Sequence, residues 1–482
     1  MTKRQTLPER FCKIFLAALS ALALTSASPP AATWQGPSPA AQMLAPSGLP
    51  SRPVAAGPVE DLYPFYMPME GLRRPAVRLF VKCDASRAAG REVYDGRDGA
   101  SLYGRAEGGY EFVYEALDSS GNPCVYPFAP WMPQLVGSLD HTQYILRSSI
   151  PGRPAIFRTG DEWASVDLRL FELGRQRIHF EMRDIQLDFR GAKQPKGALH
   201  LEVYGGEGPG LFTAVVRRSM IYGGKNAIFL PGGQSMLYVE DTDVAGNIST
   251  SPDQEHTTYI NGIIVSHLRN STWRGQRGWS NVASGHQLKD KAYLRIYENV
   301  TVANEPNGAP PSAMPLLDAS VYGFTWSDNL HIRRQEPAQA VREGLVDLRS
   351  ENTYAPPESY PWNVLATPQW RMPGDPLSVL DQVYLSVFVN TTVDSYRTEP
   401  YVFAVRPQGT YIQPGTTIVE GNDTTTRAQQ RAVSLALNTT GDIRQVYAQE
   451  GWGFVDPQLP EQGEWVLDRE KFIRHALGLI GR

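Results

Sequence analysis

Short hydrophobic runs recur through the middle of the chain, and each run lies beside an Asn, Asp, Ser or Thr. Within a run, apolar and polar positions alternate with a period of two, which is typical of a β-strand with one buried face. Aligned on the polar residue, successive runs lie 23 to 35 residues apart; the aligned residues are Asp184, Ser219, Thr242, Asn270, Asn299 and Asn329. A β-strand repeat of this length predicts a solenoid with one coil per repeat.

The predicted fold class is all-β, a right-handed parallel β-helix. A leucine-rich repeat would need a fixed Leu frame, which is absent, and a large β-sandwich with coincidental spacing is the alternative. Asn and Asp suit the bends between strands because they tolerate left-handed backbone. We expect the β-helix over residues 159–345, a β-rich N-terminal region over 61–158, and further coils with a mixed C-terminal cap over 346–482. Within that last part, residues 384–390 resemble another coil and residues 424–437 a helix.

The first residues have the pattern of a secretory signal peptide. Basic residues precede an apolar run over residues 14–24, and small residues follow up to Ala27. This run is too short to span a bilayer, so we expect cleavage near Ala27 and export to the periplasm or the medium. Residues 28–60 are rich in Ala and Pro and predict a linker.

The chain has three cysteines, and Cys12 leaves with the signal peptide. Cys83 and Cys124 then form an even pair, for which an exported protein favours a disulfide in the N-terminal region. Two buried free thiols are the alternative. Two cysteines cannot build a four-thiolate zinc site.

Composition and charge narrow the function classes. The 482 residues include 43 Gly, 38 Pro and 22 Tyr, which favours a turn-rich β protein over bulk disorder. The net charge is −4, and removing residues 1–27, which carry four positive charges and one negative, makes it −4 − 3 = −7. A mildly acidic chain disfavours nucleic-acid binding. Residues 260–300 nevertheless carry six basic and two acidic residues, a local balance of +4 that suggests an anionic ligand.

Two histidines repeat in frame with the predicted coil. His256 and His286 are 30 residues apart, and each is followed three residues later by Tyr259 or Lys289. The spacing predicts that these four side chains stack on one face of neighbouring coils. If residues 289–296 form one strand, Lys289, Lys291 and Arg295 share parity and project outward. Each residue alone is more simply explained as a solvated lysine, a polar histidine stack or a tyrosine at the edge of the core.

Two stretches carry a family resemblance: Glu255-His256-Thr257-Thr258-Tyr259 and Gly285-His286-Gln287-Leu288-Lys289-Asp290-Lys291-Ala292. They are similar to the G-H-x-x-Y motif and the G-H-x-x-K-S-R-A motif one coil later in exported right-handed parallel β-helix repeat proteins. Glu255 replaces the first Gly, and Asp290-Lys291 replaces Ser-Arg. The family usually has an Asp one coil further on, where this chain has Asp318. The resemblance covers about residues 160–340 and implies a pectate-lyase-like fold, but it fixes no substrate.

The wider fold group contains lyases, hydrolases and epimerases of polysaccharides. Lyases and epimerases remove the proton α to a uronate carboxylate, which needs a base and cations that hold the carboxylate. We therefore predict an exported protein that acts on an acidic, uronate-containing polysaccharide by β-elimination. Lys289 is the candidate base, His286 or Tyr259 the proton donor, and His256 completes the cluster. The candidate substrate-binding residues are Lys291, Arg295, Arg274, Arg277 and Asp318.

Several alternatives remain open from the sequence. A uronate C5-epimerase would use the same proton abstraction, and a glycoside hydrolase would need a carboxylate pair, for which Asp241 with Asp243 or Asp318 with Glu298 are unspecific candidates. A non-catalytic glycan-binding or adhesion solenoid is the alternative from another class. No cofactor is expected; Asp253, Glu255 and Asp290 offer oxygens for Ca²⁺ but lack a ligand-like spacing. No membrane span is expected, and the oligomeric state is left open.

Overall fold

A computed structural model describes the chain over 77–83, 109–126, 135–136, 142–158, 166–171, 177–190, 197–203, 211–232, 235–246, 256–275, 285–304, 316–319, 323–334, 346–348, 384–394, 403–405, 410–412, 417–419, 469–470, 472–473 and 476. All of these residues belong to one compact unit, Pro53–Arg482. The predicted signal peptide, the linker and the helix at 424–437 lie outside the described residues. None of the described residues forms a helix with the length and hydropathy needed to span a bilayer.

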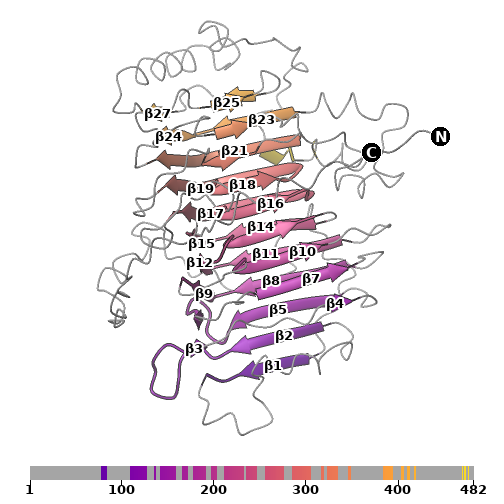
Figure 1. Ribbon diagram of the computed structural model, residues 1–482, viewed down its shortest axis with the longest axis vertical. Helices are drawn as coiled ribbons and strands as arrows, with labels where there is room; N and C mark the ends of the chain where they lie inside the picture. The colour runs from indigo at the N-terminus through magenta and orange to yellow at the C-terminus, as the bar shows by residue number, and fades with distance from the viewer. Residues whose placement is uncertain are drawn as a thin grey trace, which may run out of the picture. The chain divides into compact units, whose positions relative to one another are not determined.

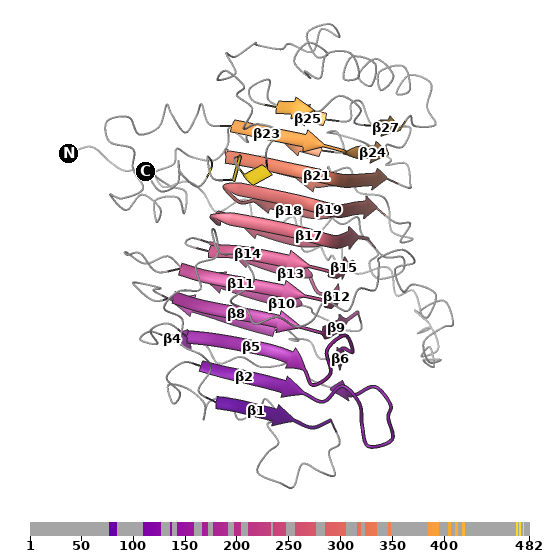
Figure 2. The same cartoon turned by 180° about the vertical axis from the view of Figure 1, so that it is seen from behind.

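An 18-stranded sheet and a 9-stranded sheet contain all of the described strands. The larger sheet bends into two faces. Its first face stacks its strands in parallel and in chain order, as Figure 2 shows. These strands are β1 (Val77–Val81), β2 (Gly109–Tyr114), β5 (Thr142–Ser148), β8 (Arg177–Arg183), β11 (Leu211–Arg217), β14 (Ser235–Glu240), the first parts of β17 (Val265–Arg274), β19 (Leu294–Asn304) and β21 (Gly323–Arg334), then β23 (Tyr384–Val389) and β26 (Thr410–Ile412).

The second face follows the first across a corner and has the same parallel order. It consists of β3 (Val125–Tyr126), β6 (Ala155–Arg158), β9 (Ile185–Phe189), β12 (Met220–Gly223), β15 (Asp243–Ala245), the second parts of β17, β19 and β21, then β24 (Thr392–Asp394) and β27 (Thr417–Val419).

The 9-stranded sheet forms the third face, which carries the candidate site (Figure 1). It runs through β4 (Leu135–Val136), β7 (Val166–Phe171), β10 (Leu199–Val203), β13 (Ile228–Pro231), β16 (Thr258–Asn261), β18 (Leu288–Lys291), β20 (Leu317–Asp318), β22 (Val346–Leu348) and β25 (Phe403–Val405). Every ladder between described strands is parallel, which excludes the antiparallel sandwich. The chain is a parallel β-solenoid, as predicted. The stack begins at β1, so the described strands of the β-rich N-terminal region continue the solenoid.

From the coil of β8 and β9 to that of β23 and β24, the chain turns from the first face to the second at one residue in left-handed conformation. The corner residues are Asp184, Arg218, Asp241, Asn270, Asn299, Asn329 and Asn390, with φ between 45° and 55°. The sequence pattern identified four of these corners correctly and placed two one residue too late. Ser219 and Thr242 follow the true corners, and each hydroxyl donates to the carbonyl two residues back, at 2.8 Å. A hydroxyl residue after the corner therefore resembles the corner itself in sequence.

Arg218 is an unusual corner residue, because Arg rarely adopts the left-handed backbone conformation. Its guanidinium donates twice to the carboxylate of Asp184 on the preceding coil, with both distances at 2.8 Å. This bidentate pair compensates for the left-handed backbone that Arg adopts reluctantly. Further along the stack, asparagine amides join the corners: Asn299 donates to Asn270 at 2.9 Å, and Asn329 donates to Asn299 at 2.7 Å.

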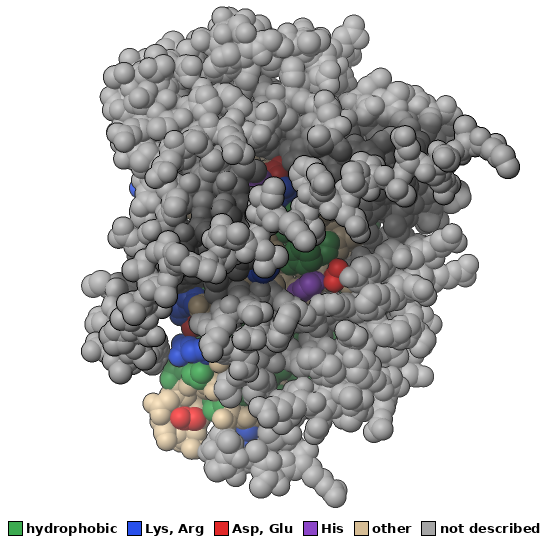
Figure 3. All heavy atoms as spheres, viewed as in Figure 1, with side chains coloured by type: hydrophobic (Ala, Val, Ile, Leu, Met, Phe, Trp, Pro, Cys, Tyr) green, Lys and Arg blue, Asp and Glu red, His purple; other side chains and the backbone are tan. Residues whose placement is uncertain are grey.

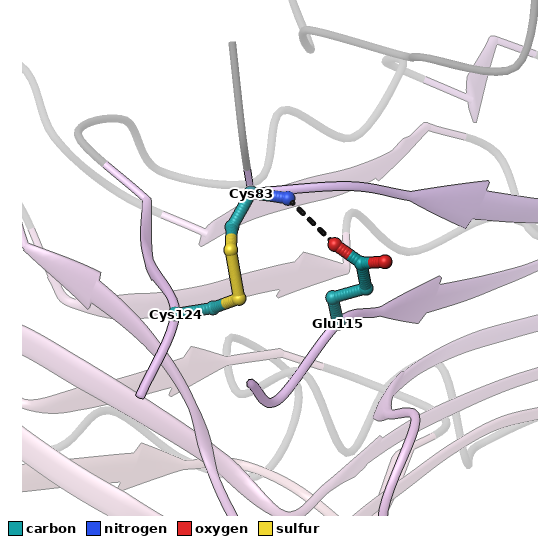
Figure 4. A group of neighbouring side chains, drawn as sticks. All are labelled: Cys83, Glu115 and Cys124. Carbon is teal, nitrogen blue, oxygen red and sulfur yellow. Dashed lines mark hydrogen bonds between the residues drawn. A yellow bond between two sulfur atoms is a disulfide. The ribbon is translucent and has the colours of Figure 1, made fainter. Parts of the chain in front are cut away.

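The disulfide between Cys83 and Cys124 is present, with the Cα atoms 5.6 Å apart (Figure 4). It connects the end of β1 to the turn that precedes β3. The carboxylate of Glu115 lies beside it and accepts the backbone N–H of Cys83 at 3.2 Å. Both sulfurs are used in the bond, so this group of residues offers no thiolate to a metal ion. The predicted pairing is confirmed.

The described C-terminal residues pack on the side of the stack. The ring of Phe472 is fully buried and lies 5.4 Å from Trp326 and 5.7 Å from Phe324, which are both on β21. Arg469 forms an ion pair with Glu298 of β19. These residues therefore cover part of the outer side of the first face.

Candidate functional site

The candidate site lies on the outer side of the third face, across β16, β18 and β20. The ladders place Tyr259, Lys289 and Asp318 in register on these three strands. Residues in register on neighbouring parallel strands project to the same face about 4.8 Å apart. Together with His256 and His286, which precede β16 and β18, these three residues are called the His/Lys cluster below.

The two histidines stack as the 30-residue spacing predicted. Their ring centroids are 5.0 Å apart, and the backbone N–H of His286 donates to Nδ1 of His256 at 3.0 Å. Because Nδ1 accepts this bond, the neutral ring of His256 carries its proton on Nε2. Burial holds the pKa of His256 well below its usual range, and the positive charges of His286 and Lys289 add to that effect. His256 is therefore neutral at pH 7.

Asp318 connects His286 to Lys289. Its Oδ2 lies 3.2 Å from Nε2 of His286 and 3.4 Å from Nζ of Lys289. The side chains of His286 and Asp318 are 2% and 1% exposed, whereas that of Lys289 is 13% exposed and reaches the surface. A carboxylate held against Nε2 orients the imidazole and favours the tautomer with its lone pair on Nδ1.

Tyr259 contacts both an aromatic ring and a charged side chain of the site. Its ring lies 5.5 Å from that of His256, and Nζ of Lys289 lies 5.7 Å from its centroid, a cation–π contact. Tyr259 is half-buried, so its edge reaches the surface of the third face. All four residues of the predicted His/Tyr and His/Lys set are thus brought together, and Asp318 joins them.

An aromatic column continues from Tyr259 onto the preceding coils and was missed from the sequence. Phe229 stacks on Tyr259 with centroids 5.6 Å apart, and His200 meets Phe229 edge-on at 4.8 Å. Nε2 of His200 lies 3.1 Å from the carboxylate of Glu202. Figure 3 shows histidine, acidic and hydrophobic side chains next to one another on this face. The missed signal was the period itself, because Phe229 lies 30 residues before Tyr259 and His200 lies 29 before Phe229.

No protein-family model, curated protein or solved structure matches this chain.

Arg295 is the clearest correction to the predicted site. It is fully buried, its Nε donates to Oγ1 of Thr325 at 2.8 Å, and its Nη1 donates to the carbonyl of Ala319 at 3.1 Å. The expectation assumed one strand over residues 289–296. In fact β18 ends at Lys291 and β19 begins at Leu294, and the corner between them exchanges the inward and outward parities. Arg295 therefore points into the solenoid, whereas Leu294 and Ile296 take the outer side.

The other predicted binding residues lie in different parts of the structure. Lys291 is fully buried, yet its charge contributes to lowering the pKa of His256, so it belongs to the surroundings of the cluster. Arg274 lies on the second face and forms a bidentate pair with Asp243, at 2.9 and 2.6 Å. Arg277 lies outside the described residues. Arg274 follows the corner at Asn270, which places it on the second face, away from the cluster.

Of the carboxylates considered for hydrolysis or Ca²⁺ binding, those that the structure describes occupy different positions in the solenoid. Glu298 accepts from His267 at 2.7 Å on the first face, whereas Asp318 belongs to the third. Asp241 is a corner residue, and Asp243 pairs with Arg274. Asp290 points into the solenoid, and Asp253 and Glu255 lie outside the described residues. The geometry favours acid–base chemistry around one histidine, one tyrosine and one cation.

Proposed function

We propose that this protein cleaves a uronate-containing polysaccharide by β-elimination, with the His/Lys cluster as its active site. The observation that carries the proposal is the arrangement of His286, Asp318 and Lys289. An imidazole oriented by a buried carboxylate is a suitable general base, and an adjacent ammonium suits a substrate carboxylate. Of the basic residues in 260–300, Lys289 lies in the cluster and Lys291 beside it, and these two positive charges support an anionic substrate.

The geometry suggests a division of roles that differs from the one expected from the sequence. Lys289 was the candidate base, but its Nζ lies 3.4 Å from Oδ2 of Asp318 in an ion pair, which is the contact of a cation with a carboxylate. We assign Lys289 to the uronate carboxylate, where its charge stabilises the enolate-like transition state. His286 takes the role of base, because a proton on Nε2 facing Asp318 leaves the lone pair on Nδ1.

The proposed reaction is an elimination across the C4–C5 bond of a uronate. His286 removes the proton on C5, the electron pair of that C–H bond forms the C4–C5 double bond, and the C4–O4 bond breaks. Tyr259, the half-buried hydroxyl in the cluster, donates the proton to the leaving oxygen. The new chain end is an unsaturated uronate, and the protons on both residues are restored through solvent.

The test is a turnover assay with the full chain on polymers of galacturonate, mannuronate, guluronate and glucuronate, with a neutral glucan as control. The conjugated double bond of the product absorbs in the ultraviolet, so rising absorbance on one uronate polymer and none on the glucan is the expected result. Binding to a uronate polymer without turnover would overturn the lyase assignment. Exchange of the C5 proton with solvent deuterium in the absence of cleavage would identify an epimerase.

The aromatic column favours one further candidate, a glycan-binding solenoid without catalysis. His200, Phe229 and Tyr259 extend the partly exposed surface over two coils beyond the cluster. Aromatic and polar edges in a row suit contact with a long polymer. On this alternative, Phe229→Ala weakens binding as strongly as any change in the cluster, and no variant alters a reaction rate.

We also propose that the protein is exported. The Cys83–Cys124 disulfide supports this, because such bonds persist in oxidising compartments, and the pattern of residues 1–27 supports it independently. The intact mass of the mature protein from its native host should correspond to a chain that begins near Ser28. A mature chain that retains residues 1–27 would contradict the proposal.

A further inference from the structure

The interior of the solenoid changes from apolar to polar at the coil that carries Lys289. On the third face, one inward column runs through Leu201, Leu230 and Ile260, and then reaches Asp290. On the first face, an inward column runs through Phe180, Ala214 and Leu237, and then through Ser266 to Arg295. Both Asp290 and Arg295 are completely buried. The apolar core is thus interrupted by charged side chains from two faces at the same coil.

Hydrogen bonds hold the interior groups in place, and Arg295 acts on Asp290 through its charge. The hydroxyl of Tyr297 donates to Oδ2 of Asp290 at 3.0 Å, and the backbone N–H of Ala292 donates to Oδ1 at 3.0 Å. Burial raises the pKa of Asp290, and the nearby charge of Arg295 and these hydrogen bonds oppose the rise. Arg295 in turn holds Thr325 and the carbonyl of Ala319. We call Asp290, Arg295 and Tyr297 the interior network.

Each anchor of the network lies one residue from a member of the His/Lys cluster. Asp290 follows Lys289 on β18, and Ala319 follows Asp318 at the end of β20. Because successive residues of a strand point to opposite faces, fixing Asp290 inward fixes the outward direction of Lys289. Holding the carbonyl of Ala319 from inside likewise fixes the backbone that carries Asp318.

The energetics indicate that stability alone does not account for the network. Moving charges into a protein interior costs several kcal/mol per ion, and replacing a buried ion pair by apolar residues is often neutral or stabilising. Earlier coils fill the same two columns with apolar residues such as Leu230, Ile260 and Leu237, so the solenoid can be built without charges there. A functional reason is therefore favoured.

We propose that the interior network is a positioning device, which sets the geometry of Lys289, Asp318 and His286 from behind the sheet. The proposal rests on the proposed function for its kinetic consequences, but the geometry can be tested without any activity. Asp290, Arg295 and Tyr297 touch no substrate on this account. They act through the backbone of β18 and β20.

The decisive variant is the double substitution Asp290→Leu with Arg295→Met, which makes the interior apolar. The matched control is Leu237→Ala, a cavity-forming change on the same inward column but two coils away. A purely structural role predicts a lower Tm for the double variant. The positioning role predicts an unchanged or higher Tm together with a disturbed site. Tyr297→Phe, which removes one hydroxyl, serves as a second variant in case the double variant fails to fold.

The first readout is the imidazole ¹⁵N spectrum of His286 across pH, which reports its tautomer and titration. We expect the double variant and Tyr297→Phe to change this titration and Leu237→Ala to leave it unchanged. The second readout is turnover on the uronate polymer that the wild-type chain cleaves. We expect kcat to fall by about 10²-fold for the double variant, the usual effect of a small misplacement, with KM nearly unchanged.

The outcomes separate the two proposals. If the wild-type chain shows no turnover but the variants shift the titration of His286, the lyase assignment fails and the positioning role stands. If the wild-type chain turns over and the variants keep both kcat and the His286 titration, the positioning role is overturned. A fall in Tm for the double variant with an unchanged His286 titration also overturns it.

Discussion

His286 and His256 are joined by a hydrogen bond, although they are 30 residues apart in the sequence. The backbone N–H of His286 donates to Nδ1 of His256 at 3.0 Å. Through this bond, the imidazole of His256 contributes a hydrogen bond between two neighbouring coils. It also fixes the tautomer of His256, so that its Nε2 is the N–H group. Protonation of Nδ1 would break the bond, which links the charge state of His256 to the packing of the two coils.

The first prediction concerns stability against pH. His256 has a lowered pKa because it is buried beside His286 and Lys289. Its stabilising contribution is therefore complete above the unfolded pKa of about 6.5 and is lost as the pH falls below that value, where the unfolded chain takes up the proton. We expect the Tm to decrease between pH 7 and pH 5, and to decrease less in His256→Gln, whose amide oxygen can accept the same bond. Equal decreases in both proteins would contradict the burial argument.

The disulfide should stabilise the N-terminal coils. Cys83→Ala with Cys124→Ala removes a cross-link between residues 41 apart, and we expect a loss of about 2–4 kcal/mol in the free energy of unfolding. Denaturant unfolding under oxidising conditions measures the loss. Added reductant should lower the stability of the wild-type chain and leave that of the double variant unchanged. Peptide mass mapping that finds both thiols free in the native protein would contradict the assignment.

Glu298 should anchor the C-terminal residues. Burial alone would raise its pKa, but the hydrogen bond and charge of His267 and the charge of Arg469 dominate and lower it to about 2. The stability it contributes is present above pH 4.5 and is lost as the pH falls from there toward 2, at about 1.4 kcal/mol per pKa unit. Glu298→Gln should therefore lower the free energy of unfolding at pH 7. It should also make this free energy fall less steeply as the pH decreases from 4.5 toward 2. Faster hydrogen exchange at Phe472 in the variant, but not at β5, would locate the effect.

The role of Lys289 can be decided with two substitutions. On our assignment the ammonium binds a carboxylate, so Lys289→Arg keeps the charge and should retain turnover within about tenfold of wild type, whereas Lys289→Met should lose about 10²-fold or more. If Lys289 were instead the base, Lys289→Arg would be as inactive as Lys289→Met, because a guanidinium stays protonated. The Tm of both variants serves as the control for folding.

The sequence predicted the parts of this structure that depend on the period. The spacing of 30 residues was sufficient to stack His256 on His286 and to place Tyr259 beside Lys289, because parallel coils keep register. It would equally have found Phe229 and His200. The error at Arg295 came from a corner at residues 292–293 that no hydrophobic pattern marks, since both sides of the corner are buried. Asp290 could not be placed inside either, because a charged residue on a strand is ordinarily solvated.

The measurement that tests the account most directly is turnover by wild type and by His286→Ala on the panel of uronate polymers. Asp318→Asn provides a second variant, because it keeps the shape but loses the charge that orients the imidazole. We predict cleavage of at least one polymer by the wild-type chain, and a loss of at least about 10²-fold in kcat for His286→Ala with an unchanged fold by circular dichroism. Wild-type rates in His286→Ala, or no cleavage of any uronate polymer by the wild-type chain, would contradict the account.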